Sequence, residues 1–503
     1  MMDIKSTMAK FGFGHRIANH IIIDSKGELW LTMTPMAVGG LLPLGMTALP
    51  GTLRLEPLEN GEAVPFTYTA TEAELILKTE KGAKIRLVID TDAHALRIAG
   101  NSAFRLNGVE AAGRAVSINA AEGAYMSVGA YRYFMTPKKG TITFDDTYLV
   151  AKFCSDTPVL EIEPDNGEFE LYVYDLPEDT EPIPVTKTID EAAAQNTADF
   201  ETFKNGLVDI PAEWGDVKEK IAYTLWLCQR TVAGKGEVTI ENKYNSGRTG
   251  ATQMAIASMA FKDARRVVDM LLAYPAELPL ITGVAIARLL DEELLNDSRG
   301  EIFRAYAALE PLARYCMQER TTDGDGLSYY AYRYESGHSP SPAFFKAGEP
   351  VLAPDLNAYL IVAGDTLGKL AKLEYDDGMA MKWDAQARGL TAKLIAELWN
   401  GEDFIGKNAY TGKLSGPDAV LSLVPIILGC KLPLDIIKKL AAKIDDNAVG
   451  TAKGLLLVGG LFDAGEKETA KGLVTKALTD ARASAIECPF YGAALLAMAH
   501  KVL

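Results

Sequence analysis

The pattern of hydrophobic and polar positions changes once along the chain. From about residue 11 to residue 184 it consists of short runs rich in β-branched and aromatic residues, and in many of them apolar and polar positions alternate. Turn sequences at 24–28 and 58–62 separate neighbouring runs. Short strands without helical periodicity between them predict an antiparallel β-sandwich. The expected strands are 21–25, 28–34, 51–58, 66–70, 73–80, 83–91, 95–100, 148–153 and 169–176.

The second half of the chain has helical periodicity. Apolar residues recur at helical spacing in twelve segments, separated by short stretches of Gly, Pro, Asp or Asn. Their spacing is not a fixed repeat, which argues against a solenoid. Twelve helices suit six helical hairpins closed into an (α/α)6 barrel, and an irregular all-α bundle is the alternative. The expected helices are 216–232, 252–261, 263–273, 283–295, 302–319, 354–374, 380–399, 418–428, 434–444, 450–462, 465–478 and 490–503.

These two patterns predict a multidomain β-then-α protein. We expect an N-terminal β-sandwich domain over residues 1–190 and an (α/α)6 barrel domain over residues 213–503. A polar segment with helical character, residues 191–212, is expected to link them. A length of 503 residues agrees with two domains rather than one core.

Composition and charge exclude several classes of protein. A net charge of −16 argues against binding to nucleic acid, which requires clustered Lys and Arg. No apolar segment approaches the roughly 20 residues that a membrane span needs, and the N-terminal segment lacks the features of a signal peptide. The five cysteines and five histidines are scattered and form no metal-binding pattern. We therefore expect a cytoplasmic protein with reduced thiols, no metal, and no membrane or nucleic-acid partner.

Residues 329–360 combine many groups that could bind a polyhydroxylated ligand. Tyrosines, phenylalanines, an arginine, a histidine and carboxylates alternate there instead of separating into core and surface positions. The Gly and Pro content predicts irregular backbone for the first two-thirds, where site residues are often found. Asp355 after Pro354 predicts the start of a helix. An ordinary surface loop held by its aromatic residues is the alternative.

The same stretch resembles a known family pattern. The residues that carry the resemblance are Glu335-Ser336-Gly337-His338, Ser341-Pro342, Phe345, Gly348-Glu349-Pro350-Val351 and Pro354-Asp355-Leu356-Asn357-Ala358-Tyr359-Leu360. They are similar to the bacterial pattern (N-D/E)-S-G-W-D-N-S-x-x-F-x-x-G-x-P-V-x-S-P-D-L-x-A-Y-L of the six-hairpin (α/α)6-barrel glycosidases, which include trehalases, glycoside hydrolase family 63 and mannosylglycerate hydrolase-like proteins. Residues 253–261, 277–284, 365–371 and 487–494 resemble further segments of that family. The resemblance covers most of the second half in register, and the sandwich only by position.

The resemblance implies an inverting α-glycoside hydrolase that acts on a small glucoside, mannoside or oligosaccharide without a cofactor. In the family pattern, the Asp after Ser-Gly-Trp is the general acid. Here Ser339 occupies that position, and His338 occupies the position of the Trp. A serine hydroxyl cannot replace a carboxylic acid as proton donor. The chain is therefore expected to be a diverged member with an altered general acid.

Three residues are the predicted catalytic groups. Glu335, four residues before Ser339, and His338 are the alternative general acids, and Glu487 resembles the general base of the family. An acid at the start of a helix is the alternative interpretation of Glu487 and of Asp355. For Arg333 and Arg248, the alternatives are an anion clamp and a structural ion pair. The predicted substrate-binding residues are Tyr330, Tyr332, Arg333, Ser339, Phe345, Asp355, Lys243 and Arg248.

Two other functions fit the same residues. A sugar isomerase or lyase on this fold would use the histidine and carboxylates for proton transfer without protonating a glycosidic oxygen. A catalytically inactive carbohydrate-binding relative would keep the aromatic residues and lose the acid. Each of the three functions implies a small carbohydrate as the partner.

Overall fold

The computed structural model describes most of the chain. The described residues are 8, 12–17, 19–23, 26–33, 53–108, 115–120, 123–128, 131–145, 148–149, 154–155, 159–176, 181–232, 236–239, 250–274, 277–296, 298–322, 326–337, 343–486 and 488–503. The chain divides into two compact units. Unit 1 consists of residues 1–205 and 222–248, and unit 2 of residues 206–221 and 249–503. The sequence predicts that the chain passes once from the first domain to the second, through the linker at 191–212. In the structure the chain passes between the two compact units three times.

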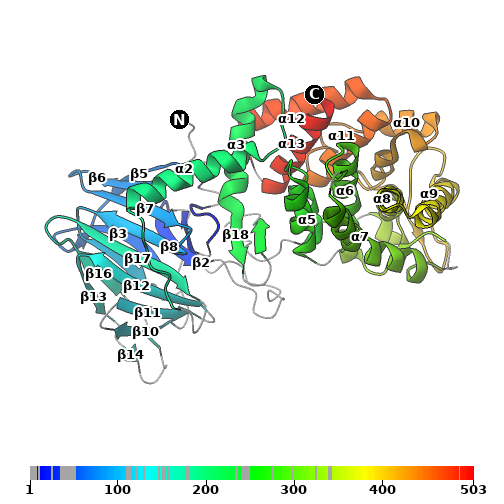
Figure 1. The fold of residues 1–503 in the computed structure, drawn as a ribbon. Helices are drawn as coiled ribbons and strands as arrows, with labels where there is room; N and C mark the ends of the chain where they lie inside the picture. Colours follow the sequence, from blue (N-terminus) through cyan, green and yellow to red (C-terminus); the bar gives the residue numbers. More distant parts are fainter. Residues whose placement is uncertain are drawn as a thin grey trace. The chain divides into compact units, whose positions relative to one another are not determined.

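Unit 1 is built from two antiparallel sheets (Figure 1). The first sheet has the order β1-β2-β3-β9-β16-β13, with β4 paired to β3. Its strands are β1 Asn19–Ile23, β2 Leu29–Met33, β3 Leu53–Glu59, β4 Glu62–Ala63, β9 Phe104–Gly108, β13 Thr141–Asp145 and β16 Val159–Glu163. The second sheet has the order β14-β15-β10-β11-β12-β17-β8-β7-β6-β5. Its strands are β5 Phe66–Ala70, β6 Leu75–Thr79, β7 Lys84–Asp90, β8 Ala95–Gly100, β10 Ala115–Ala120, β11 Gly123–Val128, β12 Tyr131–Lys139, β14 Tyr148–Leu149, β15 Cys154–Ser155 and β17 Phe169–Leu176.

One hydrophobic core lies between the inner faces of these sheets. Alternating residues of both sheets enter a single buried cluster, for example Leu55 and Leu106 from the first sheet and Leu87 and Ile98 from the second. Successive side chains of a strand point to opposite faces, so alternation along the sequence becomes an inner and an outer face. The predicted antiparallel β-sandwich is thereby confirmed. Helix α2, Ile189–Asn205, packs against strand β7.

Unit 2 is helical (Figure 1), and six of its elements form a closed ring. Within the described residues each of six elements packs against the next, in the order α4, α6, α8, η6, α11, α13 and back to α4. These are α4 Ala251–Ser258, α6 Thr282–Asp291, α8 Pro354–Leu373, the 3-10 segment η6 Val424–Lys431, α11 Ala452–Asp463 and α13 Pro489–Val502. Five helices pack on the members of this ring: α5 Ala264–Leu272, α7 Arg299–Glu319, α9 Asp377–Leu398, α10 Leu434–Ala441 and α12 Lys467–Ala483. The expected β-then-α fold with an (α/α) barrel is confirmed.

Two of the expected helices differ in the structure. Helix α3 covers Gly215–Cys228, and the rest of the segment expected to be helical is strand β18, Gln229–Val232, which pairs with β19, Gly236–Thr239. The segment expected as a helix at 418–428 consists of turns followed by η6. There the Asp418 carboxylate accepts hydrogen bonds from the backbone N–H groups of Val420 and Leu421, which competes with α-helical bonding.

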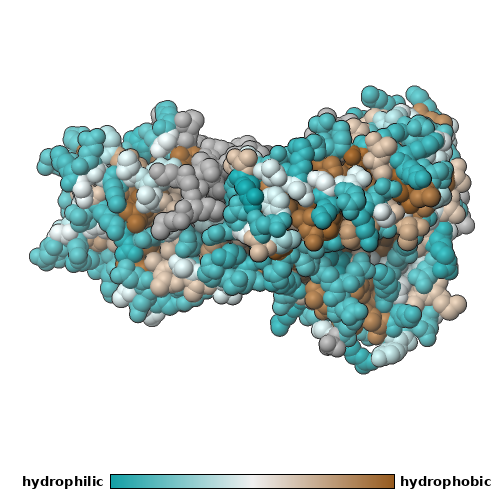
Figure 2. Space-filling view, turned by 90° about the horizontal axis from the view of Figure 1, so that it is seen from above, coloured by the Kyte–Doolittle hydropathy of each residue, from teal (hydrophilic) through white to brown (hydrophobic). Residues whose placement is uncertain are grey.

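The surface is mostly hydrophilic on the face drawn in Figure 2, with small hydrophobic patches between the polar residues. Among the described residues, none of the helices is long and apolar enough to span a bilayer.

Candidate functional site

The N-termini of three ring helices meet at one end of the barrel. Lys453, on the first turn of α11, donates hydrogen bonds to the carbonyls of Gly337 (2.7 Å) and Ser336 (3.2 Å). The same ammonium interacts electrostatically with Asp355 on the first turn of α8 and with Glu277. Glu277 accepts a hydrogen bond from the Thr252 N–H on the first turn of α4 (3.3 Å). The segment containing Gly337, singled out in the sequence, thus lies at the N-terminal end of the ring.

A pocket of about 410 Å³ opens at this end. It is lined by Glu277, Leu278, Leu312, Tyr315, Arg320, Tyr332, Tyr334 and Glu335. Tyr332 and Tyr334 are 64% and 86% exposed, so their rings are open to a ligand. Aromatic faces, two carboxylates and a guanidinium around one small pocket can stack on a sugar ring and hydrogen-bond its hydroxyl groups.

Glu335 is held in a fixed position inside this pocket. Its side chain belongs to the short 3-10 helix η4, Arg333–Ser336. The carboxylate forms an ion pair with Arg320 (Nη1 to Oε2, 2.7 Å) and accepts a hydrogen bond from the Ala331 N–H (2.7 Å). These contacts fix the orientation of the carboxylate. Reciprocally, the hydrogen bond to Glu335 raises the pKa of Arg320.

Asp355 and Tyr330 lie beneath the surface of the same region. Both residues are fully buried, and the Tyr330 hydroxyl donates a hydrogen bond to Asp355 Oδ2 (2.8 Å). Asp355 Oδ1 has no hydrogen-bond partner among the described residues. Burial raises the pKa of Asp355 to about 7, against the smaller opposing effects of Tyr330 and Lys453. These two residues do not line the pocket in this structure and are buried beneath the surface instead.

The ammonium of Lys453 is buried near that carboxyl. Burial lowers the pKa of Lys453 to about 8, while Asp355 and Glu277 act in the opposite direction. A buried acid and a buried base whose pKa values are both moved toward neutrality are characteristic of functional sites. They also occur in structural ion-pair networks, so the open pocket beside them is the stronger indication of a site.

The other described residues of the predicted site have structural contacts. Arg333 forms an ion pair with Glu349 (2.8 Å), which was one of the alternatives for it. Phe345 is buried in the 3-10 helix η5, Ala343–Ala347, and its ring lies 6.1 Å from that of Tyr330. Tyr332 is the predicted binding residue whose side chain lines the pocket, together with the predicted catalytic Glu335.

Five of the predicted site residues lie outside the described residues: His338, Ser339, Lys243, Arg248 and Glu487. Their roles therefore stay predictions. The described residues next to two of them are informative. Gly337, which precedes His338, accepts a hydrogen bond from Lys453. Helix α13, a member of the ring, begins two residues after Glu487.

Sequence reasoning missed three residues of this site: Glu277, Arg320 and Lys453. Glu277 stands in a stretch that resembles the family, so an acid followed by Leu-Pro could have been noticed. Arg320 and Lys453 stand at the end and the start of helices, where a basic residue has no distinctive pattern. Lys453 is separated from its acceptor Ser336 by 117 positions, which no local spacing can indicate.

Comparisons with known proteins agree with this fold. The family model of the mannosylglycerate hydrolase MGH1-like glycoside hydrolase domain matches residues 222–455. The family GH92 α-mannosidase of Bacteroides thetaiotaomicron is 11% identical with a TM-score of 0.55, and the match covers 98% of this chain and 79% of the mannosidase. A second GH92 family glycosyl hydrolase is 12% identical with a TM-score of 0.51, covering 93% and 78% of the two chains. A search of curated proteins gave no match. At these identities, the structural likeness shows the fold alone.

The ring architecture and these matches define the class of the protein. Its fold is that of the six-hairpin (α/α)6 glycosidases, the family that the motif at 335–360 resembles. Within that class, residues 222–455 are similar to the MGH1-like glycoside hydrolase domain, and the chain is a carbohydrate-active protein of the glycoside hydrolase type.

Proposed function

We propose that this chain is an inverting α-glycoside hydrolase that binds a small glucoside, mannoside or oligosaccharide in the pocket at the N-terminal end of the ring. The observation that carries the proposal is the pocket itself, where Glu335 and two exposed tyrosines can bind a sugar close to Gly337, the residue that precedes His338. Glycoside hydrolysis requires acidic groups on both sides of the scissile bond, and inverting enzymes separate them by about 6.5–9.5 Å.

The contacts of Glu335 bear on the choice between the two predicted proton donors. A general acid must hold a proton before the reaction begins. Oε2 of Glu335 already accepts hydrogen bonds from Arg320 and from the Ala331 N–H, so this oxygen acts as an acceptor and not as a donor. We therefore assign the donor role to His338, and assign Glu335 the task of accepting hydrogen bonds from sugar hydroxyl groups.

The reaction then follows the usual inverting course. Glu487, as base, removes a proton from water while the water oxygen bonds to the anomeric carbon. The bond from that carbon to the glycosidic oxygen breaks, and the protonated imidazole of His338 gives its proton to the departing oxygen. Both transfers are completed in one step and the configuration at the anomeric carbon is inverted.

The experiment measures hydrolysis of a panel of α-glucosides and α-mannosides by the wild type and by Glu335→Gln, Glu487→Gln and His338→Asn. We expect Glu487→Gln and His338→Asn to lower kcat/KM by about 10²–10⁴-fold, the usual contribution of general acid–base groups. Glu335→Gln should lower it less, by about 10–100-fold, the loss that hydrogen bonds to a charged group account for. Glu349→Gln is the matched control. Glu349 is also ion-paired to an arginine but does not line the pocket, so we expect activity within about threefold of the wild type.

Two results would replace this function with another. No turnover on the panel, with sugar binding still detected by calorimetry, would identify a carbohydrate-binding protein. The ion pair between Glu335 and Arg320 agrees with that outcome, because the carboxylate already has a cationic partner inside the protein. Exchange of a carbon-bound proton of the sugar without cleavage of the glycosidic bond would instead identify an isomerase or lyase.

A further inference from the structure

A second cavity, which we call the distal cavity, lies at the other end of the ring. Its volume is about 710 Å³, within the range of roughly 300–1,000 Å³ typical of ligand pockets. Five of the six elements of the ring contribute to its lining, and so does Met259, which directly follows α4. Asp291 and Asp463, the last residues of α6 and α11, are at its edge, whereas the first pocket lies near the starts of the ring helices.

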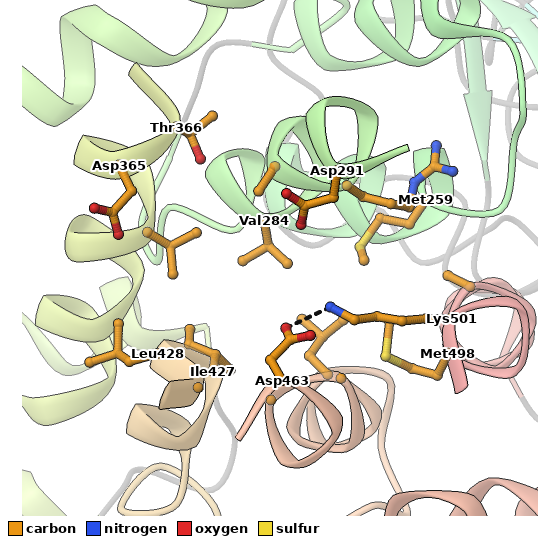
Figure 3. A pocket seen from close by; sticks show the side chains of 18 of the residues that line it. Met259, Val284, Asp291, Asp365, Thr366, Ile427, Leu428, Asp463, Met498 and Lys501 are labelled. Atoms are coloured by element: carbon orange, nitrogen blue, oxygen red, sulfur yellow. Dashed lines mark hydrogen bonds and ion pairs between the residues drawn. The ribbon is translucent and has the colours of Figure 1, made fainter. Parts of the chain in front are cut away.

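More than half of the wall of the distal cavity is apolar. Figure 3 shows Val284 above the opening, with Ile427, Leu428 and Met498 below it, so that side chains from three different elements border one space. Val284 and Ile427 are partly exposed there. Methionine side chains adapt their shape to a ligand, and Met259 and Met498 both contribute to the lining.

The edge of the cavity carries charges that are matched in pairs. Asp291 bonds to Lys369 (2.9 Å), Asp365 to Lys431, Asp463 to Lys501 (2.6 Å), and Glu292 to Arg288 (2.8 Å). Three of these pairs join neighbouring ring elements: α6 to α8, α8 to η6, and α11 to α13. Each of the four carboxylates that line the cavity thus has a cationic partner.

The apolar side chains of the wall and the paired charges at the edge together disfavour the binding of a charged ligand. A carboxylate or ammonium entering the cavity would have to take a partner from an existing ion pair, leaving the other member uncompensated. A hydroxyl group can donate to a rim carboxylate and accept from a rim ammonium while the pair stays intact. An apolar body can meanwhile fill the hollow.

We propose that the distal cavity binds a neutral amphiphile, a molecule with a hydrocarbon body and a hydroxylated head. The hydrocarbon lies against Val284, Ile427 and Met498. The head stays between the ion pairs at the rim, of which Asp463–Lys501 is the pair drawn in Figure 3. The site is independent of the sugar pocket, and it stands whether or not the chain hydrolyses glycosides.

The test uses 1,2-octanediol as the probe, with octanoate and octylamine as charged molecules of the same chain length. Binding to the full chain is measured by ligand-observed NMR titration and calorimetry below any aggregation concentration. We expect the diol to bind at least fivefold more tightly than either charged molecule. Ala287→Phe, which places a ring in the cavity from α6, should weaken diol binding at least tenfold. Ala307→Phe, the same change at an exposed position of α7, should leave it unaltered.

The ion pairs at the edge predict that substitutions there change which of the three probes binds most tightly. A hydrophobic cavity without specific polar groups would not show this change. Lys501→Gln leaves Asp463 without its cation, so octylamine should gain at least fivefold in affinity. Asp463→Asn leaves Lys501 without its anion, so octanoate should gain instead. Equal binding of the three probes in all variants, no binding of the diol, or diol binding that Ala287→Phe does not weaken would each overturn the proposal. Circular dichroism of each variant verifies that it is folded.

Discussion

At the scale of single residues, the carboxyl of Asp355 and the ammonium of Lys453 are buried beneath the candidate sugar pocket. Nothing in the local sequence distinguishes Asp355 from an ordinary acid at a helix start, since Pro-Asp is common there. Its burial depends on Tyr330 and on α11, which are distant in sequence. The aromatic and acidic character of the 329–360 stretch could be predicted, but which of its residues face the pocket could not.

Burial of Asp355 makes stability depend on pH in a defined direction. Its pKa is about 7 in the folded state and close to 3.8 when unfolded. Between about pH 4 and pH 7, only the folded state holds this proton, so the contribution of Asp355 to stability falls as pH rises. Asp355→Asn does not titrate. The free energy of unfolding of this variant relative to wild type should therefore rise across that window, by up to about 1.4 kcal/mol per pH unit.

Denaturant unfolding at several pH values measures this effect. Asp377→Asn, at an exposed position on α9, is the control and should not reproduce the trend. Parallel stability curves for wild type and Asp355→Asn would show that the Asp355 carboxyl titrates normally in the folded protein.

At the scale of elements, the twelve helical segments predicted from periodicity correspond to eleven α-helices and one 3-10 segment among the described residues. The 3-10 segment differs because Asp418 caps turns and because Gly429 adopts a left-handed φ of 57°. Strand β18 was missed because Val232, at its end, continues the helical spacing of Leu225 and Cys228 in α3. Strands such as β10, which has the sequence AVSINA, are short and contain few large apolar residues, and pairing with neighbouring strands determines them.

Close packing of α11 against η6 requires a glycine. A Cβ at Gly460 would lie 2.6 Å from the Ile426 carbonyl oxygen and 2.8 Å from Ile427 Cα, both of them backbone atoms. Gly460→Ala should therefore destabilise the protein by about 1–3 kcal/mol, because the two elements must move apart. Denaturant titration followed by circular dichroism measures the change.

Gly472 on the exposed face of α12 supplies the matched control. A Cβ there meets nothing within 4 Å, so Gly472→Ala should stabilise the helix by roughly 0.5–1 kcal/mol. If both substitutions changed the free energy of unfolding in the same direction, steric contact with η6 would not explain the effect at Gly460.

At the scale of the whole molecule, the two cavities of the ring should function independently. Ala287 lines the distal cavity and is not among the residues that line the candidate sugar pocket, so Ala287→Phe should obstruct the distal cavity alone. We expect it to reduce binding of 1,2-octanediol while kcat/KM for the best glycoside stays within about twofold of wild type. Conversely, Tyr334→Ala should weaken sugar binding and leave the affinity for the diol unaltered. A loss of glycosidase activity in Ala287→Phe, measured in the same assay, would show that the two ends of the ring are coupled.

The path of the chain limits how this protein can be divided. Unit 1 consists of two stretches of sequence, 1–205 and 222–248, because residues 206–221 between them belong to unit 2. One of the boundaries falls inside helix α3. A truncation after residue 205 removes strands β18 and β19 from unit 1, and a fragment beginning at residue 249 lacks the part of α3 that unit 2 contains. Neither unit can be produced intact by cutting the polypeptide once. A recombination or gene-fusion event that exchanges one unit must therefore replace two separate stretches of sequence.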